Sequence, residues 1–259
     1  MTDDQLLLLL CRLARQAAHE VMAVYATPFT AQAKADDSPV TEADQRAEAV
    51  IVAGLQALGL GWPIVAEEAV AAGQAPVLQP GQPFWLVDPL DGTREFVNRN
   101  GEFTVNVALV RQGRPVLGVV LAPALAAGPR LWAGVVGQGA WVEDAAGRRA
   151  IGCRTVPAAG LSVLASRSHG DDAALQAFLA GRRVASVATA GSSLKLCLIA
   201  EGLADIYPRF GRTMGWDIAA GHAVLAAAGG QVRRLDDGQP LAYGELGFEN
   251  PHFVASGLV

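Results

Sequence analysis

The chain has 259 residues, with 20 Lys and Arg against 25 Asp and Glu, so its formal net charge is −5. Hydrophobic residues make up 51% and charged residues 17%, which is enough apolar material for a sizeable core and excludes wholesale disorder. An acidic chain lacks the basic surface that binds long nucleic acid, but a small anionic ligand needs only a local positive site. At about 150 residues per domain, the length fits one large domain or two modest ones.

The composition also bears on the compartment. The longest aliphatic run, residues 6–10, is far shorter than the roughly 20 apolar residues that cross a membrane. Acidic residues precede this run where a signal peptide carries positive charge, and the three cysteines show no disulfide or zinc spacing. We therefore expect a reduced, cytoplasmic protein without a transmembrane segment, an expectation that leaves room for peripheral association with the cytoplasmic face of the membrane.

The first half is predicted to place helices against a mostly antiparallel sheet. Apolar residues at helical spacing predict a helix over residues 3–25. Thr41, followed three residues later by Asp44, predicts a capping-box start for a second helix that runs to about Gly59. Apolar and β-branched runs predict five short strands, with a hairpin turn at 111–114: residues 84–87, 103–110, 116–120, 131–133 and 140–142.

The second half is predicted to alternate between strands and helices. The polar stretch 143–149 is predicted to be a turn and the best place for a change of subdomain, which divides the chain into residues 1–149 and 150–259. Beyond it, alternation indicates an α/β layer packed on the first half. The predicted strands are 162–165, 184–187 and 204–207, and the predicted helices are 171–180, 192–201 and 217–228, the last ended by Gly229 and Gly230.

Residues 88–93 carry the strongest chemical signal in the chain. Asp88 and Asp91 straddle Pro89 directly after a predicted buried strand. Proline restricts its own backbone and that of the residue before it, so we expect the strand to end and the chain to bend. Such a bend can turn both carboxylates and the carbonyl of Leu90 toward one point, which makes an oxygen site of the kind that Mg²⁺ prefers.

Neighbouring residues add to this site. Gly92 and Thr93 open a predicted helical turn whose N–H groups can receive a phosphate oxygen. Asp-Pro and Asp-Gly are also ordinary turn formers, and Asp217 alone would be read as a helix N-cap. Glu67 and Glu68, however, also follow a predicted strand. Together these acids match what a two-metal phosphoryl-transfer centre requires.

Three motifs resemble the signatures of the inositol monophosphatase superfamily. They are Glu67-Glu68, Asp-Pro-Leu-Asp-Gly-Thr at 88–93 and Trp-Asp-Ile-Ala-Ala-Gly at 216–221. The resemblance implies a layered α-β-α-β-α sandwich, of mixed α+β and α/β character, and a lithium-sensitive phosphatase that depends on Mg²⁺.

Longer stretches resemble one branch of that superfamily, the CysQ-type 3'(2'),5'-bisphosphate nucleotidases: residues 91–96, 98–106, 166–169, 191–195 and 207–211. These enzymes remove the 3'-phosphate from adenosine 3',5'-bisphosphate, the by-product of sulfate activation, and leave AMP. The similarity runs from about residue 38 to 253. It departs at Ala66 and Arg94, neither of which is an implied metal ligand.

The resemblance implies how the metals are held. Glu67, Asp88 and the carbonyl of Leu90 would hold one Mg²⁺, and Asp88, Asp91 and Asp217 a second, with a third once substrate is bound. Two metals about 3.5–4 Å apart can stabilise both the attacking and the leaving oxygen of a phosphate, with a metal-bound water attacking in line.

Two arrangements for deprotonating that water stay open. Thr93 either hydrogen-bonds Glu67, or it pairs with Asp44, whose motif at 40–44 also resembles the family. We favour Asp44 with Thr93, and a role of Thr93 in capping its own helix is compatible with either arrangement. The implied catalytic residues are therefore Asp44, Glu67 and Thr93.

The second phosphate of the substrate is expected to meet the Gly-Ser-Ser turn at 191–193, because a turn that enters a helix offers N–H and hydroxyl donors to an anion. His169 is implied to stack on or hydrogen-bond the adenosine, whereas His222 is predicted to be structural. The complete set of implied substrate contacts is Glu67, Leu90, Asp91, Gly92, Thr93, His169, Ser192, Ser193, Lys195, Arg209 and Asp217.

Two other functions stay open. A sugar-phosphate phosphatase of the same superfamily, acting on inositol monophosphate or fructose 1,6-bisphosphate, would share every metal ligand and differ in the segment 191–211. A catalytically idle protein that senses a phosphorylated nucleotide would be favoured by the loss of an acidic ligand, and none is lost here.

Overall fold

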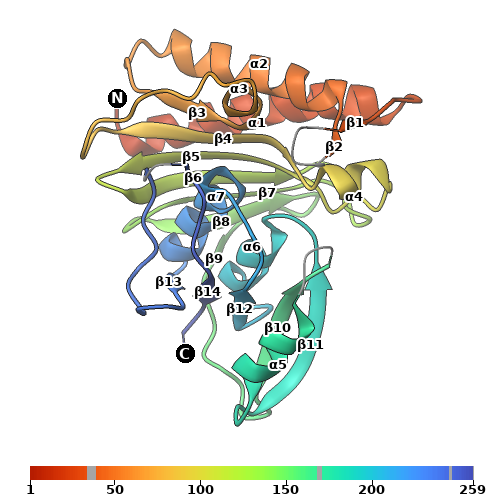
Figure 1. Ribbon diagram of the computed structural model, residues 1–259, viewed down its shortest axis with the longest axis vertical. Helices are drawn as coiled ribbons and strands as arrows, with labels where there is room; N and C mark the ends of the chain where they lie inside the picture. The colour runs from red at the N-terminus through yellow and green to blue at the C-terminus, as the bar shows by residue number, and fades with distance from the viewer. Residues whose placement is uncertain (34–38, 168–170, 245–246, 259) are drawn as a thin grey trace.

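Five alternating layers of helix and sheet make up the computed structural model (Figure 1). Helices α1 (Asp3–Tyr25) and α2 (Glu42–Ala57) cover one face of a seven-stranded sheet, and α7 (Gly215–Ala227) packs on the other face beside α6 (Leu194–Ala200). A five-stranded sheet follows, with α5 (Asp172–Leu179) on its outer face. This order confirms the predicted α-β-α-β-α sandwich. The structure describes residues 1–33, 39–167, 171–244 and 247–258.

The seven-stranded sheet has the order β3-β4-β5-β6-β7-β8-β9 and is antiparallel except for the parallel pair β3–β4. β5 and β6 form the predicted hairpin at 111–114. The strands of the seven-stranded sheet are β3 (Ile64–Ala66), β4 (Phe84–Asp91), β5 (Thr104–Arg111), β6 (Arg114–Ala122), β7 (Arg130–Val135), β8 (Gly139–Asp144) and β9 (Gly147–Ile151).

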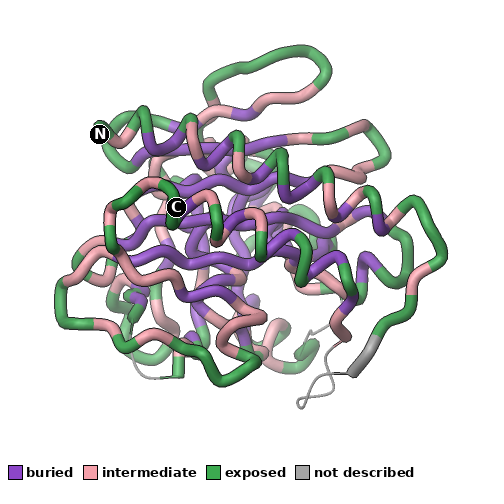
Figure 2. Tube along the Cα trace, turned by 90° about the horizontal axis from the view of Figure 1, so that it is seen from above, coloured by how far each residue is buried: buried purple, intermediate pink, exposed green. Residues whose placement is uncertain are grey.

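This sheet separates two cores, which explains why its central strands are continuous apolar runs. Side chains alternate across a strand, so Trp85 and Val87 face α1 and α2, while Phe84 and Leu86 face the layer of α6 and α7. Figure 2 shows the resulting buried residues gathered along the strands, with exposed residues in the loops. β4 is therefore held rigidly up to the point where the acidic motif begins.

The five-stranded sheet has the order β11-β10-β12-β14-β13. β10 runs parallel to both β11 and β12, so the loops that follow these three strands lie at the same edge of the sheet, where ligands of α/β folds usually bind. Its strands are β10 (Leu161–Ser166), β11 (Val184–Ala190), β12 (Ile206–Arg209), β13 (Gln231–Arg234) and β14 (Phe253–Ser256). The short elements are β1 (Gln32–Ala33), β2 (Pro39–Val40), α3 (Glu67–Ala71) and α4 (Thr93–Val97).

The prediction of one turn over 143–149 is wrong. β8 and β9 form a hairpin across it, in which Glu143 pairs with Arg148, and Arg149 contacts Asp144 at 2.8 Å. β9 is an exposed edge strand stabilised by cross-strand charges, so it lacks the apolar alternation that identifies a strand. Residue 149 thus lies inside a strand, and the division of the chain there stays a prediction. No helix in the described ranges is long and apolar enough to span a membrane.

Candidate active site

The acidic motif leaves β4 through a bulge. Asp88 pairs with Asn106 of β5 and Asp91 with Thr104, so β4 carries one residue more than its partner between these pairs. The strand therefore continues to Asp91 instead of ending before Asp88, because the bulge accommodates a proline that cannot donate a ladder hydrogen bond. The backbone N–H of Leu90 donates to Asp88 Oδ1 at 3.0 Å and fixes that carboxylate.

Gly92 then turns the chain into α4. Its φ of +88° is in the left-handed region, and a Cβ there would lie 3.3 Å from the carbonyl oxygen of Glu102 and from Oε2 of Glu95. Glycine makes this turn without strain and without displacing its neighbours. Gly92 is the N-cap of α4, so Thr93 is the first residue of this helix and does not cap it.

Thr93 instead reaches the start of α2. Its hydroxyl lies 3.3 Å from Asp44 Oδ1 and 3.2 Å from the carbonyl oxygen of Leu90, and it can donate to either. Asp44 is 1% exposed, and its Oδ2 accepts from the backbone N–H of Thr41 at 2.7 Å, as the predicted capping box requires. The same oxygen also accepts from the Thr41 hydroxyl at 2.8 Å. Of the two arrangements open for Thr93, the structure contains the pair with Asp44.

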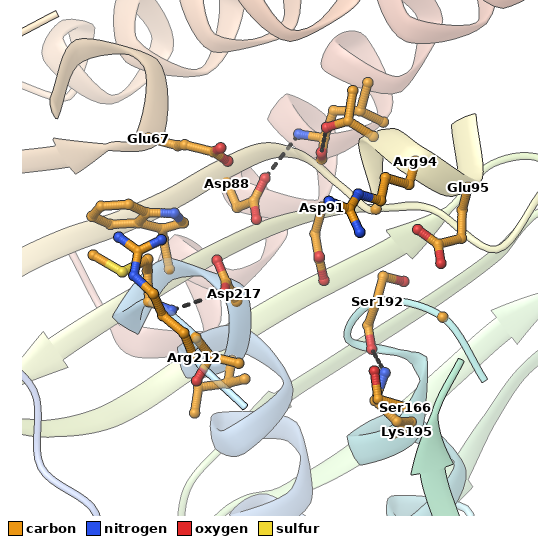
Figure 3. A pocket seen from close by; sticks show the side chains of 18 of the residues that line it. Glu67, Asp88, Asp91, Arg94, Glu95, Ser166, Ser192, Lys195, Arg212 and Asp217 are labelled. Carbon is orange, nitrogen blue, oxygen red and sulfur yellow. Dashed lines mark hydrogen bonds between the residues drawn. The ribbon is translucent and has the colours of Figure 1, made fainter. Parts of the chain in front are cut away.

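Five carboxylates line one cavity of about 530 Å³, those of Glu67, Asp88, Asp91, Glu95 and Asp217 (Figure 3). Glu67 begins α3 directly after β3, and Asp88 and Asp91 flank the bulge of β4. Asp217 is the third residue of α7, so the reading of Asp217 alone as an N-cap does not hold, and its Oδ2 accepts the N–H of Met214 at 2.8 Å. We call the carboxylates of Glu67, Asp88, Asp91 and Asp217 the acidic wall.

Burial and repulsion between carboxylates raise the pKa values of Asp88, Asp91 and Asp217. Burial, and then the carboxylates of Glu67, Asp91 and Asp217, raise the pKa of Asp88 well above its usual range. The pKa of Asp217 is raised by burial and by Asp91 and Glu67. Burial raises the pKa of Asp91 to about 6, although nearby Lys195 lowers it.

This donor set fits a hard divalent cation, which relieves both burial and repulsion of carboxylates. Among the described residues, no three His, Cys, Asp or Glu side chains already surround a single metal position. The four carboxylates therefore line one cavity without converging on a single metal position.

The opposite side of the cavity carries the predicted donors. Ser192 and Lys195 line it from the loop after β11 and the start of α6, and Arg209 lines it from the end of β12. The amine of Lys195 donates to the carbonyls of Ala190 and Ser192 at 3.0 and 2.7 Å, and burial lowers its pKa to about 8. Arg209 donates to the carbonyls of Gly211 and Arg212 at 3.2 and 2.9 Å. We call Gly191, Ser192, Lys195 and Arg209 the donor wall.

Ser193 has a different place from the one predicted. It is 1% exposed behind the cavity, and its hydroxyl donates to the carbonyl oxygen of Asp217. Its backbone N–H bonds Asp91 and lowers the pKa of that carboxyl. It therefore orients two residues of the acidic wall, and α6 begins one residue later than it, at Leu194. Ser192, Lys195 and Arg209 stay predicted substrate contacts, and His169 lies outside the described residues.

Two arginines that line the cavity were missed as site residues in the sequence. Arg94 and Arg212 both line the cavity and are exposed, and Arg212 also pairs with Glu249 at 3.3 Å (Figure 3). Arg94 follows Thr93 directly, so its place in the motif could have identified it. Arg212 reaches the cavity only because the segment after β12 turns back toward α7, and no local pattern indicates that.

Comparisons with known proteins identify the family of the chain. The chain matches the model of the inositol monophosphatase family over residues 2–256, and it belongs to that family. It is an enzyme of the phosphatase class, as its motifs predict.

Within the family, the chain is similar to proteins called 3'(2'),5'-bisphosphate nucleotidase CysQ. It is 47% identical to that of Escherichia coli O157:H7 over 249 residues, 95% of this chain and 97% of the other. It is 40% identical to that of Buchnera aphidicola over 255 residues, 96% and 92% of the two chains. The crystal structure of CysQ from Bacteroides thetaiotaomicron matches with a TM-score of 0.77 at 35% identity, over 95% of both chains.

Proposed function

We propose that this protein is an Mg²⁺-dependent nucleotidase that hydrolyses the 3'-phosphate of adenosine 3',5'-bisphosphate to AMP and phosphate. The observation that carries the proposal is the division of one cavity into an acidic wall and a donor wall. A substrate with two phosphate groups can place one at each wall. Adenosine 3',5'-bisphosphate, the by-product of sulfate activation, is such a substrate. We expect the protein to work in the cytoplasm.

The acidic wall would hold the metal. Glu67, Asp88, Asp91, Asp217 and the Leu90 carbonyl supply oxygen ligands for two Mg²⁺, with a third when substrate is bound. When bound, Mg²⁺ would neutralise charge on the phosphate oxygens and activate the attacking water. Because Mg²⁺ also reverses the local charge, a phosphorylated anion can enter a chain of net charge −5.

Thr93 and Asp44 would move the proton. The Thr93 hydroxyl lies 3.3 Å from Asp44 Oδ1, so its oxygen can accept a proton from water while its own proton passes to that carboxylate. Asp44 is held in place by two hydrogen bonds from Thr41. The donor wall would meanwhile bind the second phosphate through Ser192, Lys195 and Arg209, with His169 against the adenosine.

The test compares kcat/KM for adenosine 3',5'-bisphosphate, inositol 1-phosphate and fructose 1,6-bisphosphate, each with Mg²⁺ and with the chelator EDTA. We expect the nucleotide to be preferred by at least about 100-fold, which is roughly 2.7 kcal/mol of transition-state binding, and all turnover to stop with EDTA. A preference for either sugar phosphate would overturn the proposal. Binding of the nucleotide without turnover would favour a sensor.

A further inference from the structure

Glu102 joins the two halves of the cavity. It lies in the loop between α4 and β5, and its carboxylate accepts two hydrogen bonds from Arg167, at 3.0 and 2.8 Å. Oε2 also accepts the backbone N–H of Gly191 at 2.7 Å. Arg167 follows β10 and Gly191 follows β11, so a single side chain of the first half contacts the ends of two parallel strands of the second.

The backbone of Glu102 lies between two critical turns. A Cβ on Gly191 would come within 2.7 Å of the Glu102 carbonyl oxygen, and a Cβ on Gly92 within 3.3 Å of the same atom. The turn at Gly92 carries the acidic wall, and the turn at Gly191 opens the donor wall. Both turns therefore pack on one peptide, which sets their separation.

Glu102 also supports an unusual backbone conformation in the donor wall. Ser192 has a φ of +40°, which a residue with a side chain rarely adopts. Its hydroxyl donates to the carbonyl oxygen of Glu102 at 3.0 Å, which holds the turn in this form. The donor wall is thus shaped by contacts with Glu102 as well as by the amine of Lys195.

We propose that Glu102 is a positioning residue for substrate selection. It fixes the distance between the turn that holds the metals and the turn that receives the second phosphate, and Arg167 holds its carboxylate in orientation. This inference rests on the proposed function. The Glu102 and Arg167 side chains are 25% and 42% exposed, so their charge attraction contributes little to stability, whereas a two-bond carboxylate–guanidinium contact fixes direction well.

The experiment compares Glu102→Ala and Glu102→Gln with the wild type, using adenosine 3',5'-bisphosphate and adenosine 3'-monophosphate, which lacks the second phosphate. We expect Glu102→Ala to raise KM for the bisphosphate about tenfold, the effect of one lost charge-assisted contact, with kcat within about twofold. Glu102→Gln keeps an acceptor for the N–H of Gly191 and should recover part of the loss. The kcat/KM for the monophosphate should stay within about twofold of the wild-type value in both variants.

Glu143→Gln is the matched control, because Glu143 is a comparably exposed glutamate, paired with Arg15 and Arg148, on a distant strand. It should change the KM and kcat of neither substrate. Equal losses in kcat for both substrates, or an unchanged KM in Glu102→Ala, would overturn the inference. Failure of the proposed function is separate, since it appears in the wild type as no preference for the bisphosphate. Glu102→Gln decides the question if Glu102→Ala does not fold.

Discussion

The two walls of the cavity have opposite charges and are stabilised in different ways. The carboxylates of the acidic wall are buried against one another, which raises the pKa values of Asp88, Asp91 and Asp217. The cations of the donor wall, Lys195 and Arg209, are also buried, but they donate to backbone carbonyls of their own loops. A bound cation would therefore relieve the repulsion in the acidic wall, whereas the donor wall is shaped by the chain itself. We expect changes in the first to affect chemistry and changes in the second to affect recognition.

The largest effect is expected from Asp91→Asn. Groups that only orient a metal ligand change activity by about 10–100-fold, and loss of a ligand itself should lower Mg²⁺-dependent phosphate release by at least about 1,000-fold. Without Mg²⁺, the variant should unfold at the same or a higher temperature than the wild type, because a repelled charge has been removed. The exposed Asp4→Asn is the control and should change neither quantity. Near-normal turnover in Asp91→Asn would contradict the assignment of the acidic wall.

The next largest effect is expected from Thr93→Val, which keeps the shape of Thr93 and removes its hydroxyl. General acid–base groups contribute about 10²–10⁴-fold, so kcat should fall at least about 100-fold while KM and the Mg²⁺ dependence change little. Thr93→Ser keeps the hydroxyl beside Asp44 and should retain most of the activity. If Thr93→Val keeps the kcat of the wild type, the proton does not pass through Thr93.

A smaller effect, confined to recognition, is expected from Lys195→Met. One charge-assisted contact corresponds to about a tenfold rise in KM for the bisphosphate, and kcat should change less. Burial lowers the pKa of Lys195 to about 8, so its charge is present below this pH and lost above it. The wild-type KM should therefore rise as the pH passes 8, whereas the KM of the variant should stay flat. A rise of the same size in both would assign the titration to another group.

The closeness of Asp88 and Asp91 could be predicted from the sequence because both belong to one short motif around Pro89. The proline distorts the strand there, although β4 continues through a bulge instead of ending. The motifs also place Glu67 and Asp217 near the starts of helices. The order of the layers followed from the resemblance and not from periodicity. β9 was missed because its alternating residues are charged.

The donor wall was harder to predict because it depends on contacts between residues far apart in the chain. Glu102 meets Gly191 across 89 positions, and Ser193 reaches Asp217 across 24. Spacing identified the Gly-Ser-Ser turn but not which way each hydroxyl points. Ser193 was therefore assigned to substrate when it holds Asp217, and Arg212 was missed altogether.

The smallest effect on turnover is expected at His222, which lies on α7 with Asp217 but faces away from both walls. It is 6% exposed and shares a hydrogen bond of 2.9 Å with the hydroxyl of Tyr243. Burial, and then nearby Arg114, lower the pKa of His222 from 6.5 to about 3. Between these values the unfolded chain binds a proton that the folded chain does not, so acidification below pH 6.5 should lower the free energy of unfolding.

His222 contributes at most about 1.4 kcal/mol per pH unit to the slope of the free energy of unfolding against pH. The stability lost at low pH is fully regained above pH 6.5. His222→Gln should flatten the dependence by that amount in denaturant titrations between pH 4 and 6.5, because the carboxylates contribute equally to both proteins. His19→Gln, at an exposed position, should keep the wild-type slope. Turnover at pH 7.5 should be unchanged in both variants, and a loss in His222→Gln would mean that α7 transmits changes in the core to Asp217.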